Sequence, residues 1–262
     1  MTDYVHGYGT REQERLVDQA EHWRHRLIAN GTTLEPGTRL LEVGCGVGAV
    51  LAVLGQEFPG IILHGVDIEP TQLAFARGHL ERARVEATLV EADARALPFA
   101  DQSFDHVWMM WLLEHLADPL EILREARRVL VPGGAITAIE VDYATCHADP
   151  STPALEALFR AMVQGMAASG WSDAGTRLPD WLHEAGFRDV DEGERPFSWQ
   201  GEDLAGQANY AADVMESALD SLAQLPGTSR EELRRGLDDL RSLPSQPSGS
   251  LGWVMHKSTA IR

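Results

Sequence analysis

Short apolar runs alternate with helical stretches from Arg39 onward, and this alternation constrains the fold more than any other feature of the chain. Such a rhythm is typical of βαβ units, in which parallel strands are covered by helices. The predicted strands are 39–43, 61–66, 87–91, 104–110 and 134–140. The predicted helices between them are 48–58, 70–83 and 119–130. The sequence therefore predicts an α/β fold with a doubly wound, mostly parallel sheet.

The two ends of the chain depart from this rhythm. Near the start, an amphipathic helix is predicted over 11–29 from four apolar residues at helical spacing, Leu16, Ala20, Trp23 and Leu27. Beyond Asp142 we expect helices at 152–168, 177–185, 202–223 and 228–241, and strands at 187–194 and 253–261. The last of these strands is expected to return to the sheet.

A glycine-rich loop follows the first predicted strand, with Gly44, Gly46 and Gly48 directly before a helix. Glycine lets backbone amides at a helix start approach a ligand closely. Asp67 ends the next strand about 20 residues on, where this fold places a carboxylate against ribose hydroxyls. Together the loop and Asp67 predict a site for a nucleoside-containing cofactor.

Two acidic residues help to choose the cofactor. Gly44, Gly46 and Ala49 also fit the dinucleotide pattern G-x-G-x-x-G/A, so a nicotinamide oxidoreductase is an alternative. Glu42, directly before the loop, would repel a pyrophosphate but can help to orient a loop that receives an ammonium group. Asp93 ends the third strand, where it could accept a hydrogen bond from the amine of adenine, or cap a helix or turn.

Six stretches of the chain carry a resemblance to a known family. They are Leu41 to Gly48, Gly65 to Asp67, Glu91 to Ala94 with Leu97 to Phe99, Ser103 to Asp105, Leu113 to Leu116, and Leu130 to Gly134. Over about residues 37–142 the chain resembles the class I S-adenosylmethionine-dependent methyltransferases. The resemblance implies a Rossmann-like, seven-stranded sheet whose last strand is antiparallel, with the cofactor between strands 39–43 and 104–110.

The resemblance also implies roles for individual residues. Glu42 and the glycine loop would hold the methionine part of S-adenosylmethionine, and Asp67 the ribose. Asp93 with Ala94 would hold the adenine, while Ile68 flanks its ring. S-adenosylhomocysteine would be the product.

The opening of the chain, from His6 to Ala20, resembles a bacterial subgroup in which the N-terminal segment folds over the cofactor. In this segment Tyr8 is a candidate for cofactor binding and Tyr4 a candidate for catalysis, with a frayed terminus as the alternative for both. We accordingly divide the chain into a gating segment (1–36), a cofactor-binding core (37–145), and substrate-side helices with closing strands of the same domain (146–262).

Methyl transfer from a sulfonium needs a positioned nucleophile, and a hydroxyl acceptor also benefits from a base. His115 is the second catalytic candidate, with a structural role at a helix start as its alternative. Trp111 is either a π face for the sulfonium or a core residue. Glu114, Glu140, Asp142, Tyr143 and His147 are further polar residues after the fourth and fifth strands. A pocket or core role is open for Met162, Met166, Trp171 and Trp181.

The charge and hydropathy of the chain make some classes of partner unfavourable. The formal charge of −18 disfavours nucleic acid as a partner, and no apolar run is long enough to span a membrane. We expect a cytoplasmic enzyme without a metal, and assembly into a homo-oligomer stays open.

The predicted function is methyl transfer to C, N or O of a small molecule, with a secondary metabolite as the favoured acceptor. A nucleic-acid methyltransferase is disfavoured also because the chain has no Asn/Asp-Pro-Pro-aromatic motif, and a cofactor-binding regulator without activity stays open.

Overall fold

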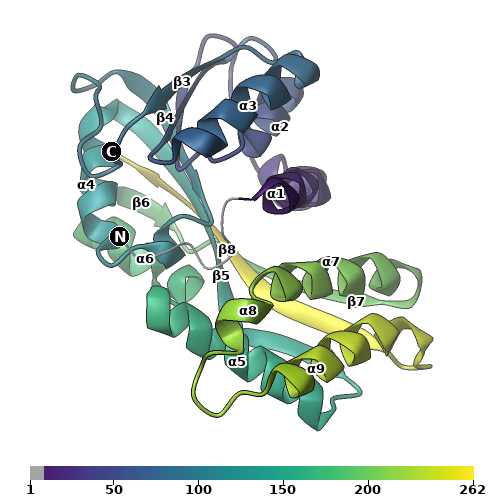
Figure 1. Ribbon diagram of the computed structural model, residues 1–262. Coiled ribbons are helices and arrows are strands. Elements are labelled where there is room, and N and C mark those ends of the chain that lie inside the picture. The colour runs from purple at the N-terminus through teal and green to yellow at the C-terminus, as the bar shows by residue number, and fades with distance from the viewer. Residues whose placement is uncertain (1–8) are drawn as a thin grey trace.

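A computed structural model describes residues 9–262, and its centre is a twisted sheet (Figure 1). The first five strands pair in parallel in the order β3-β2-β1-β4-β5. They are β1 (Arg39–Val43), β2 (Ile62–Asp67), β3 (Ala87–Glu91), β4 (Phe104–Met110) and β5 (Leu130–Asp149). The order reverses between β1 and β4, as the family resemblance implies. The carboxyl ends of these strands therefore meet around one crevice, where such folds bind ligands.

Three further strands, joined through antiparallel pairs with β8, complete an eight-stranded sheet. β8 (Ser250–Ile261) pairs with β5, and β6 (Arg188–Asp191) and β7 (Glu194–Gln200) both pair with β8. The return strand is thus confirmed, while β7 adds one strand to the seven expected. Its sequence contains Pro196 and two charged residues, which argue against a central strand. An edge strand tolerates them because one side of its backbone needs no partner.

Helices cover both faces of the sheet. α1 (Thr10–Trp23) continues into a π-helix, Arg24–Ile28, and shares a core cluster with α2 (Ala49–Glu57). α3 (Pro70–Ala83) follows β2. A second core cluster packs α4 (Pro119–Val129) and α6 (Ala174–Glu184) against the sheet. Within residues 9–262 no helix combines the length and the apolar character needed to cross a membrane.

β5 and β8 run well beyond the parallel sheet and carry a second group of helices (Figure 1). The helices of this extension are α5 (Pro153–Ser169), α7 (Leu204–Ser217), α8 (Leu219–Leu222) and α9 (Arg230–Ser242). The single helix expected at 202–223 is wrong, because a 3-10 turn over 201–203 precedes α7 and a break at Ala218 separates α8. The Ser217 hydroxyl donates to Val214 O at 2.7 Å, a local bond that competes with the regular helical pattern.

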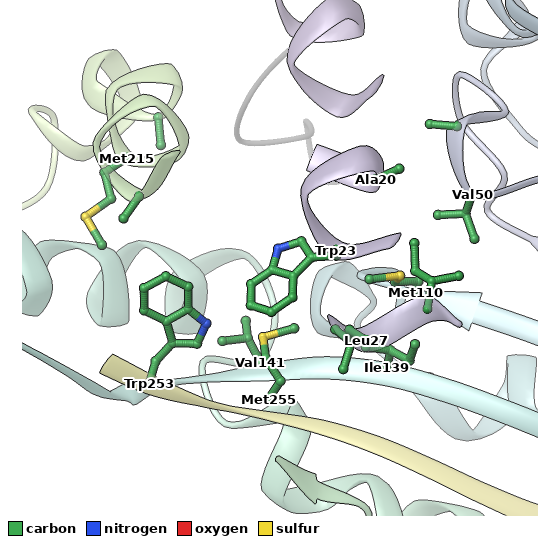
Figure 2. Packing of buried hydrophobic residues seen from close by; sticks show 14 of the residues in the cluster. Ala20, Trp23, Leu27, Val50, Met110, Ile139, Val141, Met215, Trp253 and Met255 are labelled. Carbon is green, nitrogen blue, oxygen red and sulfur yellow. The ribbon is translucent and has the colours of Figure 1, made fainter. Parts of the chain in front are cut away.

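Trp23 joins these two parts of the molecule. Its indole lies between α1 and the strands β5 and β8, above Val141 and Met255 (Figure 2). Trp23 is 1% exposed, and its Nε1 donates to the Tyr210 hydroxyl of α7 at 2.9 Å. The amphipathic N-terminal helix is therefore confirmed, and it packs on both the parallel sheet and the helical extension.

Candidate functional site

A cavity of about 890 Å³ opens where the carboxyl ends of the parallel strands meet. One side is formed by the glycine loop and by the residues that follow β2, β3 and β4. The other side is formed by α1, α5, α7 and β8. Of the predicted site residues, those that line the cavity are Glu42, Gly44, Gly46, Asp67, Ile68, Asp93, Ala94, Trp111 and His115. Its volume lies in the range for a drug-sized ligand, roughly 300 to 1,000 Å³.

Asp67 holds the glycine loop in place. Its carboxylate accepts from the backbone amides of Gly46 at 2.8 Å and Glu69 at 2.9 Å. Burial raises the pKa of Asp67. A Cβ at Gly46 would meet no atom of the described chain within 4 Å, so this part of the loop faces open space. A ligand can therefore approach the Gly46 backbone closely.

The other two glycines have packing roles. A Cβ at Gly44, whose φ is +74°, would lie 2.8 Å from Leu112. Gly48 is not among the residues that line the cavity. With φ +71°, it lies where a Cβ would be 3.2 Å from Ala76 of α3, so it allows close packing of the loop on that helix. The direct cofactor contact expected of Gly48 has no support from this placement.

Glu42 is a buried carboxyl group of the cavity lining with one oxygen unpaired in the described chain. It is 2% exposed, and its Oε2 has no hydrogen-bond partner among residues 9–262. Burial and the neighbouring Asp67 raise the pKa of Glu42 well above its ordinary value. An isolated buried carboxylate is unfavourable unless it is protonated or paired. A cationic ligand group in the cavity would supply that partner.

Ile68, Asp93 and Ala94 form the rim expected to hold a base. Ile68 is 52% exposed, which is unusual for a large apolar side chain and suits packing against a flat ring. Asp93 is already engaged, because its carboxylate accepts from the backbone amide and the guanidinium of Arg95. That ion pair lowers the pKa of Asp93. Asp93 therefore stabilises a turn and also lines the cavity beside Ala94.

Trp111 and His115 follow β4. Trp111 has a left-handed backbone, φ +52°, which is rare for a bulky residue, and its amide donates to Ile139 O at 2.9 Å. It lies at the cavity wall rather than in the fully buried core. His115 ends the 3-10 turn Leu113–His115, and burial lowers its pKa to about 4. The imidazole is thus neutral near pH 7. Tyr4 and Tyr8 lie outside the described residues.

The far end of the cavity is apolar and comes mainly from the helical extension and β8. Its lining includes Met162, Tyr210, Met215, Trp253 and Met255. Of the four residues considered for a pocket, only Met162 lines the cavity. Trp171 and Trp181 instead pack edge to face, with ring centroids 5.3 Å apart. Sequence reasoning missed the α7 and β8 residues, since only the tertiary fold brings them to the glycine loop.

Fold and site together define a protein that binds a nucleoside cofactor at the switch point of a Rossmann-like sheet. Residues 41–138 match a family model described as a methyltransferase domain. A demethylmenaquinone methyltransferase of Renibacterium salmoninarum is 30% identical over 206 residues, which are 72% of this chain and 82% of that protein. The chain therefore belongs to the class I S-adenosylmethionine-dependent methyltransferases, as its motifs predict.

Other relatives are similar over a smaller part of their length or at lower sequence identity. The 27-O-demethylrifamycin SV methyltransferase of Amycolatopsis mediterranei is 35% identical over 133 residues, which cover 50% of this chain and 48% of that protein. This chain spans about half the length of several curated relatives that it matches. A structure of Haemonchus contortus phosphoethanolamine N-methyltransferase 2 gives a TM-score of 0.57 at 20% identity, covering 94% of this chain and 52% of that one. That likeness supports the fold.

Proposed function

We propose that this protein transfers a methyl group from S-adenosylmethionine to an apolar small molecule of the secondary-metabolite type. One observation carries the proposal: a single cavity joins the glycine loop and Asp67 to an apolar end lined by α5, α7 and β8. The first part suits a nucleoside cofactor, and the second suits a hydrophobic acceptor. Methionine side chains adapt to irregular apolar ligands. The relative named for 27-O-demethylrifamycin SV supports this class of acceptor.

The residues present fit S-adenosylmethionine. Glu42, whose buried oxygen lacks a partner in the described chain, would accept from the ammonium of the methionine part. Asp67 would accept from the ribose hydroxyls, and Asp93 with Ala94 would border the adenine beside Ile68. Gly46, where a side chain would meet no atom of the described chain within 4 Å, would let the cofactor approach the loop backbone, and Gly44 would border it. This set favours S-adenosylmethionine over a nicotinamide cofactor, because an ammonium group can pair with the buried Glu42 and a pyrophosphate cannot.

Bound S-adenosylmethionine supplies an electrophilic methyl group on a positively charged sulfur. The protein then has to hold the acceptor in line and exclude water. Trp111 would present its ring toward the sulfonium, and neutral His115 would accept a hydrogen bond from the acceptor. α1 and the helical extension would act as a lid, since Trp23 connects them over the cavity.

The decisive experiment measures cofactor binding and turnover separately. Calorimetry with S-adenosylhomocysteine and with NAD distinguishes a methyltransferase from a nicotinamide enzyme. Mass spectrometry of an acceptor panel incubated with S-adenosylmethionine then detects the added methyl group. Tight binding of S-adenosylhomocysteine with no turnover on any acceptor would favour the inactive regulator, and tight binding of NAD would contradict the proposal.

Asp67→Ala is expected to weaken S-adenosylmethionine binding by about 1 to 3 kcal/mol. The substitution removes the proposed hydrogen bonds to the ribose and also frees the Gly46 amide, which Asp67 holds at 2.8 Å. Titration calorimetry gives the affinity, and circular dichroism checks the fold. Asp220→Ala, at an 86% exposed side chain, is the control. Unchanged affinity in folded Asp67→Ala would remove this residue from the site.

Deletion of residues 1–10 is expected to lower turnover by at least about tenfold while the sheet stays folded. The deletion removes Tyr4 and Tyr8, which we propose as catalytic and cofactor-binding residues. α1 continues from this segment and contributes Arg15 and Leu16 to the cavity lining. Steady-state assays give turnover, and thermal unfolding reports the sheet. Tyr8→Phe separates the hydroxyl from the ring, and full turnover of the shortened protein would contradict a gating role.

A further inference from the structure

Two buried glutamates beside the cavity take no part in the cofactor site described above. Glu114 belongs to the 3-10 turn after β4 and is 2% exposed, and Glu140 in β5 is fully buried. Glu140 Oε1 accepts from the backbone amides of Leu112 at 3.1 Å and Leu113 at 2.8 Å. These bonds fix Glu140 behind the turn that carries Glu114.

Glu140 is near enough to Glu114 that each carboxyl group affects the ionisation of the other. Glu114 Oε2 and Glu140 Oε2 have no hydrogen-bond partner within residues 9–262. Two neighbouring buried carboxyl groups are not readily ionised together, so one proton held between them is the favoured state. Burial raises the pKa of Glu114 well above its ordinary value and that of Glu140 to about 7. Near neutral pH, Glu114 therefore carries the proton and Glu140 is the group that can accept it.

Tyr143 connects this pair to the cavity. Its hydroxyl donates to Glu114 Oε1 at 3.1 Å, and both residues line the cavity. Burial and the adjacent Glu114 raise the pKa of Tyr143 well above its ordinary value, so the side chain stays a phenol. A phenol oxygen that donates one hydrogen bond can also accept one. An acceptor hydroxyl in the cavity could therefore donate to Tyr143 Oη.

We propose that Tyr143, Glu114 and Glu140 form a proton relay for hydroxyl acceptors, so that the substrate is an apolar phenol- or enol-like compound methylated on oxygen. This inference rests on the proposed function. The acceptor O–H bond breaks as its O–CH₃ bond forms, and the cofactor sulfur keeps the electron pair of its methyl bond. The acceptor proton moves to Tyr143 Oη, the Tyr143 proton to Glu114 Oε1, and the Glu114 proton to Glu140 Oε2. Tyr143 touches the substrate, whereas Glu114 and Glu140 act through it.

The relay has a defined pH dependence. The ionisable groups around it are His115, 3.4 Å from Glu114 Oε1, with Cys146 and Asp142 near Tyr143 and Tyr210 near Glu114. Burial lowers the pKa of His115 to about 4 and raises those of Cys146 and Tyr210 to about 12. Glu140 must be ionised to receive the proton. Methylation of a hydroxyl should therefore increase as the pH rises through about 7, where the pKa of Glu140 lies, and fall below it.

Glu114→Gln tests the relay with almost no change in shape. The new amide can accept from Tyr143, so that hydrogen bond and the charge of the pair are kept, but an amide does not pass the proton on. The probes are 2-naphthol and 2-naphthylamine, which differ only in the acceptor group. We expect the ratio of naphthol to naphthylamine methylation to fall by at least about 100-fold, and Tyr143→Phe to act likewise.

Glu156→Gln, at a 59% exposed side chain of α5, is the matched control and should change the ratio by less than about twofold. A readout independent of turnover is infrared spectroscopy of the cofactor-free protein at neutral pH. The spectrum of the wild type minus that of Glu114→Gln should contain a protonated-carboxyl band. Absence of that band, or an unchanged ratio in Glu114→Gln, would overturn the relay.

The same experiment separates this inference from the proposed function. A wild-type protein that binds S-adenosylmethionine but does not methylate 2-naphthol contradicts the relay alone. A wild-type protein that does not bind S-adenosylmethionine in calorimetry contradicts the proposed function, whatever the infrared band shows.

Discussion

Trp23→Ala is expected to lower the free energy of unfolding by about 3 to 5 kcal/mol, the usual cost of removing a buried tryptophan. The indole is 1% exposed and lies edge to face with Phe197, at a centroid distance of 4.9 Å, and with Trp253 at 6.2 Å. Its removal would leave a void between α1 and the sheet that the rigid strands β5 and β8 cannot close. Urea unfolding followed by circular dichroism measures the loss.

Trp23→Phe is the matched variant, because it keeps a ring but removes the Nε1 donor to Tyr210. We expect it to cost less than the alanine variant. The alanine variant should also bind S-adenosylmethionine more weakly, since Trp23 lines the cavity. A loss of less than about 1 kcal/mol in Trp23→Ala would show that α1 does not pack on the sheet in solution.

Lys257→Met is expected to lower the free energy of unfolding by at least about 2 kcal/mol, from about 1 kcal/mol or more for each of two buried carbonyls. Lys257, the only lysine in the sequence, lies in β8 and is 3% exposed. Its Nζ donates to the carbonyls of Leu27 at 2.8 Å, Ile28 at 3.1 Å and Asn30 at 2.5 Å. The ammonium thus binds the carboxyl end of the N-terminal helix, where a cation is favourable.

Methionine has a similar volume and no donor, so the loss would come mainly from the two buried carbonyls, those of Leu27 and Ile28. Arg177→Met is the control, because its ion pair with Asp173 is exposed and contributes about 1 kcal/mol or less. Denaturant unfolding compares the two variants. Equal losses in both would mean that water replaces the Lys257 ammonium at the helix end.

The parallel sheet and most of its helices were predictable from local patterns. The predicted bounds are confirmed for four elements, β1, β3, β4 and α3. Each has apolar residues at the spacing of its structure, every second residue in a strand and every three to four residues in the helix. The length of β5 was not predictable. It runs to Asp149 because it pairs with β8, and pairing between strands so far apart in sequence leaves no local signal.

The placement of the proposed cofactor residues was predictable for a related reason. Gly44, Gly46 and Asp67 follow directly from strand ends, and parallel strands bring their carboxyl ends together. Asp93 was predicted at the rim, but its ion pair with Arg95 appeared only in the structure. The proton shared by Glu114 and Glu140 could not be predicted, because it depends on the distance between two chain segments and on their burial.

The sequence by itself therefore determined the class of fold, the family and the position of the glycine loop, because hydrophobic period and turn residues act over a few neighbouring positions. Only the tertiary structure decided which helices close the cavity and which buried carboxyl groups lie behind its wall. Trp23, Lys257 and Glu140 act through contacts with segments distant in the chain. Burial then decides how these polar groups ionise and pair. Away from water, a charged group or a carbonyl without a hydrogen-bond partner costs much more free energy than it does at the surface.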